Sequence, residues 1–277
     1  MKIKEFQTIL KKHDKLRNDC LNLIASENIT SKNVRLALAS DIQHRYYFTN
    51  NYLTKAGFSY QYRGTNHIKE MIDNTKKLAM EVFDADYVNL DMLSGHISNL
   101  NILFSYCKPG DTVFCSNTEY GGYPGLAFDK LPKYLGLKIE YIPQSEVGGA
   151  VNLELLKTMI HEKSPKIVIL SSSITLFPFP VKEVSSLCRE KGIIFVYDAS
   201  HPLGLIAGKQ FQEPFKEGAD IIIGSTHKTF PGPQGGIILG KGNCSEIMKA
   251  TDFVTVDNIH INRIAALGVA LLEMKEY

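Results

Sequence analysis

The sequence predicts an α/β protein in which a mostly parallel, doubly wound sheet lies between two layers of helices. From residue 67 onward, short apolar runs alternate with amphipathic helical segments, which is the pattern of a parallel sheet covered on both faces. Apolar residues make up 44% of the 277 residues and charged residues 22%, as in ordinary globular proteins. Polar residues follow five of the predicted strands directly. We therefore expect a three-layer α/β/α architecture.

The expected elements follow in chain order. Short apolar runs predict strands at 87–93, 112–115, 138–142, 166–170, 192–197, 219–223 and 236–239. Helical spacing of apolar residues predicts helices at 67–83, 97–106, 123–131, 153–161, 181–190 and 263–277. The last helix reaches Tyr277 without a Gly or Asn cap, so we expect that the sequence is interrupted at this point and does not stop at a natural helix end.

Residues 1–66 lack this regular alternation of apolar runs and helical segments, and we expect them to form an N-terminal arm. Segment 3–21 predicts a helix with one apolar face, which needs a partner surface on its own body or on a second subunit. The rest of the arm is polar and rich in tyrosine, a residue that combines large contact area with one hydrogen-bonding tip. Its composition favours packing and binding roles equally. Five tyrosines fall within 17 positions: Tyr46, Tyr47, Tyr52, Tyr60 and Tyr62.

Composition excludes several classes of function. The formal net charge is +2, which gives no electrostatic reason to expect nucleic acid or membrane partners. No apolar run approaches the ~20 residues that span a bilayer. The five cysteines are scattered, with no CxxC pair and no His cluster at zinc spacing, so we expect reduced thiols, no metal site and a cytoplasmic location. The first residues lead into a charged helix and do not form a signal segment.

The residues that follow the predicted strands suggest a single site, because ligands of open α/β sheets bind at the carboxyl ends of the strands. Together these residues supply acids, an amine, hydroxyls and planar rings. The five groups are Ser94-Gly95-His96, residues 116–122, Ser171-Ser172-Ser173, Asp198-Ala199-Ser200-His201 and Ser225-Thr226-His227-Lys228.

Lys228 is the central candidate. It follows an apolar run and two hydroxyl residues, and it precedes a turn rich in Gly and Pro at 231–236. An amine held in this way suits imine formation with an aldehyde. The alternative is a solvated loop lysine.

The other groups complete a consistent chemistry. Ser94 and Gly95 before a helix can hold a phosphate, or serve as a plain N-cap. Asp198 can keep a pyridine nitrogen protonated, or act as a turn residue. Tyr120 beside two glycines can stack on a flat ring. Together they match pyridoxal 5′-phosphate. Neither GxxxxGK[ST] nor GxGxxG is present.

At these residues the sequence resembles the serine hydroxymethyltransferases, a family of fold-type I pyridoxal-phosphate enzymes. The resemblance covers nearly the whole chain from about Leu21. It is carried by LIASENITS at 23–31, HRY at 44–46, YRGT at 62–65, DASH at 198–201, STHKT at 225–229 and GPQGG at 232–236.

The resemblance implies a fold and a set of roles. Residues 67–277 would form the large cofactor-binding domain, of aspartate aminotransferase type, and residues 1–66 an arm with a tyrosine-rich segment for the dimer and active site. Catalytic roles would belong to Lys228, His201, Tyr46 and Tyr62. Cofactor binding would involve Lys228, Asp198, His201, Ser94, Gly95, His96, Tyr120, Ser173, Ser225 and His227; substrate binding would involve Ser26, Tyr46 and Tyr62. The two tyrosines would come from the partner subunit of a homodimer or higher homo-oligomer.

Departures from the family pattern bear on the reaction. Phe48 stands where the family has a glutamate that serves the retro-aldol step and folate chemistry. Its loss would weaken hydroxymethyl transfer by roughly 10²–10⁴-fold if nothing replaced it, and it places the use of tetrahydrofolate in question. The extended segment 49–61 offers Tyr52, Lys55 or Tyr60 as a substitute. The family's paired histidines are Tyr120 and Tyr123 here, with Glu119 as a nearby acid.

The family's small C-terminal domain carries an arginine that clamps the substrate carboxylate, and by the resemblance it would lie beyond Tyr277. We therefore expect a fragment, or a chain completed by a second polypeptide. The expected substrate is a small amino acid, and the expected reaction is serine–glycine interconversion through Cα–Cβ cleavage. The alternatives are a folate-independent threonine-type aldolase or transaldolase, a cofactor-binding homologue that is catalytically incomplete, and an α/β domain without a cofactor.

Overall fold

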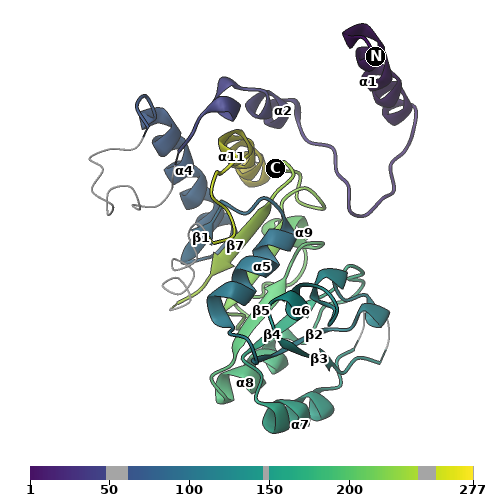
Figure 1. Cartoon of the computed structure of the whole chain (residues 1–277), viewed down its shortest axis with the longest axis vertical. Helices are drawn as coiled ribbons and strands as arrows, with labels where there is room; N and C mark the ends of the chain where they lie inside the picture. The colour runs from purple at the N-terminus through teal and green to yellow at the C-terminus, as the bar shows by residue number, and fades with distance from the viewer. Residues whose placement is uncertain (48–61, 146–149, 243–253, 277) are drawn as a thin grey trace.

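The chain folds around one seven-stranded mixed sheet (Figure 1). The computed structural model describes residues 1–47, 62–145, 150–242 and 254–276. The strand order is β1-β7-β6-β5-β4-β2-β3, with β2 to β6 mutually parallel and β7 and β1 antiparallel to their neighbours. The strands are β1 (Tyr87–Asn89), β2 (Thr112–Ser116), β3 (Lys138–Ile142), β4 (Ile167–Ser171), β5 (Ile194–Asp198), β6 (Ile221–Ser225) and β7 (Gly236–Gly240).

Helices cover both faces of this sheet. Alternate strand residues point to opposite faces, so each strand contributes to two separate cores. One core joins the strands to α4, α7, α8, α9 and α11, and the other joins them to α5. The helices of these layers are α4 (Asn66–Phe83), α5 (Gly95–Tyr106), α6 (Leu131–Tyr134), α7 (Leu153–Lys163), α8 (Val181–Glu190), α9 (Leu203–Ala207) and α11 (Ile261–Glu276).

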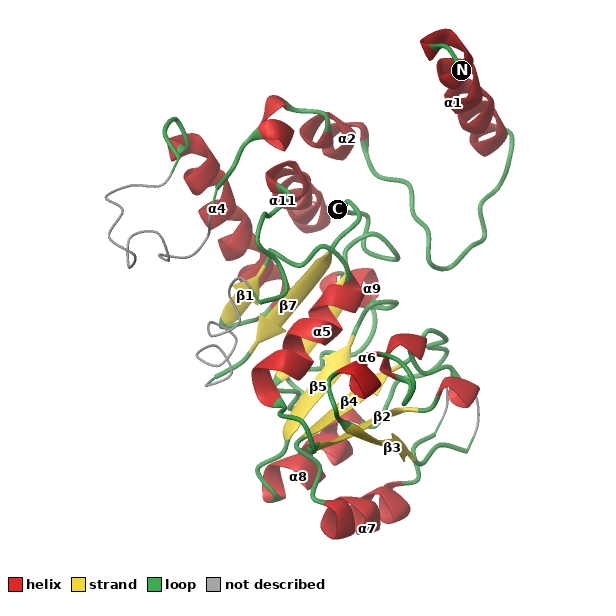
Figure 2. Cartoon of the chain, viewed as in Figure 1, coloured by secondary structure: helices red, strands yellow, loops and turns green. Residues whose placement is uncertain are grey.

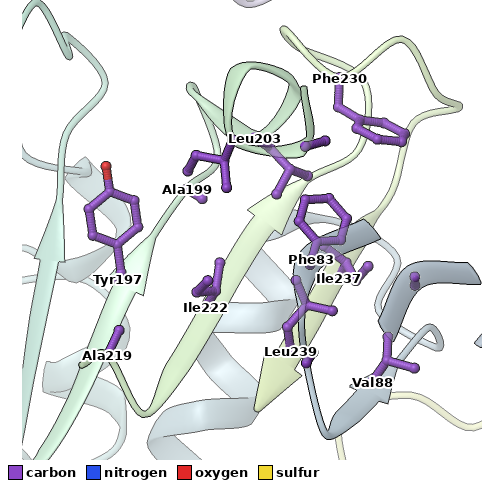
Figure 3. Packing of buried hydrophobic residues seen from close by; sticks show 14 of the residues in the cluster. Phe83, Val88, Tyr197, Ala199, Leu203, Ala219, Ile222, Phe230, Ile237 and Leu239 are labelled. Atoms are coloured by element: carbon purple, nitrogen blue, oxygen red, sulfur yellow. The ribbon is translucent and has the colours of Figure 1, made fainter. Parts of the chain in front are cut away.

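Apolar side chains pack α9 and the loop after β6 onto strands β6 and β7. Figure 3 shows Ile222 and Leu239 on the sheet, with Leu203 and Phe230 above them. All four side chains are buried, and the Phe230 ring lies 6.2 Å from the ring of Phe83 on α4. The apolar runs that predicted these strands thus become a core shared by α4, α9 and the loop after β6.

The predicted fold class is confirmed, and most predicted elements form within a few residues of their expected ends. The strand expected at 87–93 ends at Asn89. The helix expected at 123–131 is wrong: that stretch holds only a 3₁₀ turn, η3 (Pro124–Leu126), before α6 begins at Leu131. Pro124 has no N–H to donate within a helix and Gly125 is a poor helix former, so the apolar spacing misleads there.

The N-terminal region divides into two parts. α1 (Ile3–Asn18) has no buried residue and stands apart from the body (Figure 2). α2 (Lys32–Leu38) packs on α11, where Asn262 Nδ2 donates to the Leu38 carbonyl at 2.7 Å. The 3₁₀ turn η1 (Asp41–His44) follows. The helix predicted at 3–21 is therefore present, with its apolar face uncovered in the single chain.

Candidate functional site

A pocket of about 160 Å³ lies at the carboxyl ends of the parallel strands. Its walls come from the ends of β4, β5 and β6 and from the first turn of α5. This is the edge at which the sequence predicted a site. The lining residues are Ser94, Gly95, His96, Asn99, Tyr123, Ser172, Ser173, Asp198, Ser200, His201, Ser225, His227 and Lys228.

The loop that carries Lys228 is closed by its own hydrogen bonds. The buried Thr226 hydroxyl donates to the Pro233 carbonyl at 2.7 Å, and the Thr226 N–H donates to the Gly235 carbonyl at 3.0 Å. Gly232 allows the loop to fold tightly, since a Cβ there would lie 2.6 Å from the Thr226 carbonyl oxygen. Lys228 is therefore presented from a short, internally bonded loop.

A second loop, after β5, is tied to the lysine loop. The Thr229 hydroxyl donates to the His201 carbonyl and accepts from the Gly204 N–H at 3.0 Å. A Cβ on Gly204 would come within 2.3 Å of the Thr229 carbonyl oxygen, so only glycine permits this approach. The loops that follow β5 and β6 are thus bonded to each other through Thr229.

Asp198 ends β5 and is held at both carboxylate oxygens. The Ser200 N–H donates to Oδ1 at 2.9 Å, and the Asn99 side-chain amide donates to Oδ2 at 3.2 Å. The residue is 6% exposed, so these bonds compensate a buried acid. Its carboxylate can accept a further hydrogen bond from a cationic ring nitrogen in the pocket.

The first turn of α5 forms the opposite wall. The Ser94 hydroxyl caps the helix by accepting from the Ile97 N–H at 3.2 Å. The first N–H groups of a helix have no partner within it and carry partial positive charge, which suits an anion. A Cβ at Gly95 would lie 2.6 Å from Ser225 Oγ and 3.0 Å from Ser200 Oγ. The bare glycine therefore allows the hydroxyls of Ser200 and Ser225 to lie close to the helix end, and the two hydroxyls with this helix end form what we call the Gly95 cradle.

Burial shapes the protonation of the cationic groups. Burial lowers the pKa of the Lys228 ammonium, although the charge of Asp198 opposes this shift. Burial, then the charge of Lys228, lowers the pKa of His201 to about 4, again against Asp198. The same two causes lower the pKa of His227, whose Nδ1 accepts from the Gly235 N–H at 3.5 Å. Both imidazoles are neutral near pH 7, and the amine is more easily deprotonated than an ordinary lysine.

His96 and Tyr123 form a pair on the remaining wall. His96 Nδ1 lies 2.7 Å from the Tyr123 hydroxyl, and the rings meet edge to face. Burial raises the pKa of Tyr123, with a further contribution from the charge of Asp198. The tyrosine therefore keeps its proton and can donate it to His96 in this hydrogen bond.

Most of the predicted site residues meet in this pocket. Those that line it are Ser94, Gly95, His96, Ser173, Asp198, His201, Ser225, His227 and Lys228.

Four predicted site residues lie elsewhere. Tyr120, in the 3₁₀ turn η2 (Thr118–Tyr120), is half-buried outside the lining. Ser26 is exposed on the arm, although its neighbour Asn28 donates to the Thr229 carbonyl at 3.3 Å. Tyr46 and Tyr62 are each 47% exposed, with their ring centroids 5.5 Å apart. Phe48, Tyr52, Lys55 and Tyr60 lie outside the described residues.

Sequence reasoning assigned no site role to four lining residues, Asn99, Tyr123, Ser172 and Ser200. Tyr123 was noted only as standing at the position of a family histidine. Asn99 sits one helical turn after Gly95, so a search of the same helix face would have found it. Ser172 and Ser200 belong to groups already noted after strands, but nothing in their type distinguished them from turn residues.

The described residues contain no cluster of three His, Cys, Asp or Glu side chains that could hold a metal ion, and their four cysteines are free. Within those same ranges, every helix is too short or too polar to cross a bilayer.

Comparison with known proteins decides the family. The model of the family described as serine hydroxymethyltransferase matches residues 1–264. The chain belongs to this family. Among curated relatives, it is 43% identical to the serine hydroxymethyltransferase of Methanosphaera stadtmanae over 98% of this chain, and 41% identical to that of Methanobrevibacter smithii over 99%.

A solved structure shows the same fold. The crystal structure of L-threonine transaldolase from Pseudomonas fluorescens in its internal aldimine state matches 99% of this chain and 62% of its own, with a TM-score of 0.90 and 28% identity. The chain spans about 63% of the length of the first two curated relatives.

Proposed function

We propose that this chain binds pyridoxal 5′-phosphate in the pocket at the carboxyl edge of its sheet. The observation that carries the proposal is the convergence of an amine, a buried acid and a helix N-terminus on one cavity, from three separate elements. The cradle at Gly95 fits a phosphate because it combines a helix end with the hydroxyls of Ser200 and Ser225. The neighbour solved in its internal aldimine state supports the proposal.

Each residue would have a definite task. Lys228 would hold the aldehyde carbon covalently, helped by the burial that makes its amine easier to deprotonate. Asp198 would hold the proton on the ring nitrogen, and Ser94 and Gly95 the phosphate. His201, neutral through burial, would lie beside the ring as a hydrogen-bonding group that carries no charge. Ser173 and His227 would contact the cofactor from the neighbouring strand ends. When bound, the cofactor supplies an electron sink for charge developed at the substrate Cα.

Chemical trapping tests this assignment. Borohydride treatment of protein mixed with cofactor should fix the cofactor to the peptide that contains Lys228, as read by mass spectrometry after proteolysis. Lys228→Ala should carry no such label, and Lys209→Ala, which removes an exposed lysine outside the pocket, should carry the normal one. Label on another lysine, or none, would reject the assignment.

We propose that the reaction is cleavage and formation of the Cα–Cβ bond of a small β-hydroxy amino acid, with serine–glycine interconversion as the leading case. The names of the curated relatives support it. The named activity of the structural neighbour, a threonine transaldolase, favours the alternative of aldol chemistry without folate. Phe48, at the position of the family's glutamate by the sequence motif, favours the same alternative.

Substrate tests separate the two reactions. Glycine formed from serine only when tetrahydrofolate is present supports hydroxymethyl transfer. Cleavage of threonine or another β-hydroxy amino acid without folate supports the aldolase or transaldolase reaction. Phe48→Glu should raise the folate-dependent rate if that position serves proton transfer, and Phe48→Gln is its uncharged control. A protein that binds cofactor but cleaves neither substrate would be a catalytically incomplete homologue.

We also propose that the functional unit is a homodimer or higher homo-oligomer in the cytoplasm. The supporting observation is α1, whose apolar side chains are all exposed and none of whose residues is buried. Residues 1–66 would act as an arm on a neighbouring subunit, with Ser26, Tyr46 and Tyr62 reaching that subunit's pocket, and residues 67–277 would be the cofactor-binding domain. Sedimentation equilibrium should give a mass of at least two chains; a single-chain mass at micromolar concentration would contradict this assembly.

A further inference from the structure

We infer that Asn99 is a positioning residue that fixes the Asp198 carboxylate relative to the first turn of α5. The inference rests on the proposed cofactor site, because it concerns the two groups that would hold opposite ends of the cofactor. Asp198 would face the ring nitrogen, and the α5 turn would face the phosphate. Asn99 connects them directly.

The contacts of Asn99 define its orientation. Its side-chain nitrogen donates to the Gly95 carbonyl and to Asp198 Oδ2, each at 3.2 Å. A carbonyl oxygen and an ionised carboxylate can only accept, so the amide must turn its NH₂ group toward both. The residue is 1% exposed, which leaves it little freedom to rearrange.

This arrangement restricts Asp198 from two sides. The Ser200 N–H holds Oδ1 at 2.9 Å from within the loop after β5, and Asn99 holds Oδ2 from α5. Rotation of the carboxylate would break both bonds. Asn99 is the member of this set that comes from another layer of the fold, and it therefore sets the position of the acid relative to the Gly95 cradle.

Stability alone does not account for Asn99. Its own carbonyl oxygen is buried and has no hydrogen-bond partner among the described residues, an arrangement that costs stability. Asn101 on the same helix is equally buried at 1%, but it donates to the Thr255 hydroxyl at 2.9 Å and does not line the pocket. Asn101 is therefore a matched control for loss of a buried amide from α5.

The consequence is specific to the ring nitrogen. If Asn99 orients Asp198, its loss should weaken the bond to the nitrogen more than it weakens binding of the phosphate. A general disturbance of α5 would weaken both alike. An analogue of the cofactor in which a C–H group replaces the ring nitrogen separates these effects, because it cannot bond to Asp198.

The experiment measures dissociation constants for the cofactor and this analogue by calorimetry, with wild type, Asn99→Leu, Asn99→Ala and Asn101→Leu. Wild type should prefer the cofactor by about 10–100-fold, as expected for one hydrogen bond to a charged group. Both Asn99 variants should lower that preference by roughly tenfold, and Asn101→Leu should keep it. Melting curves establish that each variant is folded, and Asn99→Ala serves where Asn99→Leu does not fold.

Each outcome has a distinct meaning. An unchanged preference in the folded Asn99 variants overturns the inference and leaves the cofactor site intact. A preference lost equally in Asn101→Leu also overturns it, since the effect would then belong to the helix. Wild type that binds neither ligand rejects the proposed cofactor function, which is a separate failure.

Discussion

The pocket loops and the N-terminal helix are built in opposite ways. The loops after β5 and β6 are bonded to each other through Thr229 and closed internally through Thr226. α1 buries none of its residues and exposes Ile3, Phe6, Ile9, Leu10 and Leu16. The loops have their partners within one chain, whereas the helix presents an apolar face that one chain leaves unused. The pocket lining that the structure describes therefore comes from one chain, whereas α1 has an apolar face that the described residues leave uncovered.

The largest effect is expected where the pocket is tightest. Gly95→Ala would bring a Cβ within 2.6 Å of Ser225 Oγ, so the hydroxyls around the cradle must turn away. Loss of one hydrogen bond to the charged phosphate should weaken cofactor binding by about 10–100-fold. Calorimetric titration measures it. Gly208→Ala, whose Cβ would meet nothing closer than 3.4 Å, is the control. Wild-type affinity in Gly95→Ala would argue against a phosphate at this turn.

The next effect concerns the rate at which the cofactor attaches. Because burial lowers the pKa of Lys228, its free amine should be available at a lower pH than that of an ordinary lysine. The attachment rate, followed by stopped-flow absorbance, should rise with pH, and the midpoint of that rise should lie below the ordinary lysine pKa of about 10.4. Each unit of lowering makes the free amine about tenfold more abundant at neutral pH. A midpoint at or above pH 10.4 would show that burial has no such influence.

A smaller effect is expected in the acid range. His201 has a pKa of about 4 when folded and about 6.5 when unfolded, so the unfolded chain binds the proton more readily between these values. The contribution of His201 to the free energy of unfolding is fully present above pH 6.5 and is lost as the pH falls toward 4. After allowance for solvent screening we expect a loss of about 1–2 kcal/mol. Urea unfolding at pH 7 and pH 4.5 measures how far the free energy of unfolding drops with acid, and this drop should be smaller by that amount in His201→Gln than in wild type. An equal drop in both proteins would contradict a buried neutral imidazole.

The smallest effect on the fold is expected in the arm. Phe6→Ser with Leu10→Ser alters two half-exposed side chains of α1 that touch no core. At concentrations where the protein is a single chain, the free energy of unfolding should change by no more than about 0.5 kcal/mol. At higher concentrations, sedimentation should show loss of the oligomer. A large destabilisation of the single chain would mean that α1 packs on its own body.

Sequence patterns predicted the sheet and most of its helices because apolar runs and helical spacing reflect burial directly. They failed at 123–131, where Pro124 and Gly125 override the spacing, and they gave no sign that β7 and β1 are antiparallel to their neighbours. The site residues likewise divide into those that the sequence patterns predicted and those that they missed. Residues after strands were found by the rule that ligands bind at carboxyl ends, and nine predicted site residues line the pocket.

The residues that pattern could not assign depend on contacts across the fold. Asn99 could not be assigned from the sequence because its contact with Asp198, 99 positions away in the chain, exists only where the fold places β5 beside α5. Tyr120, beside the Gly121-Gly122 turn, was predicted to bind the cofactor, yet of the two tyrosines that flank this turn Tyr123 is the one that lines the pocket, where it pairs with His96. Tyr46 and Tyr62 were predicted to act from a partner subunit and Ser26 to bind the substrate, and a single chain leaves all three outside the pocket lining.

The most direct test of the pocket as a cofactor site is a spectroscopic titration of wild type and Lys228→Ala with pyridoxal 5′-phosphate. Wild type should bind one equivalent per chain and develop a visible absorbance band that persists through gel filtration. Lys228→Ala should lack that band and release the cofactor on the column, while its melting curve shows that the fold is intact. A persistent band in Lys228→Ala, or none in wild type, would contradict the account.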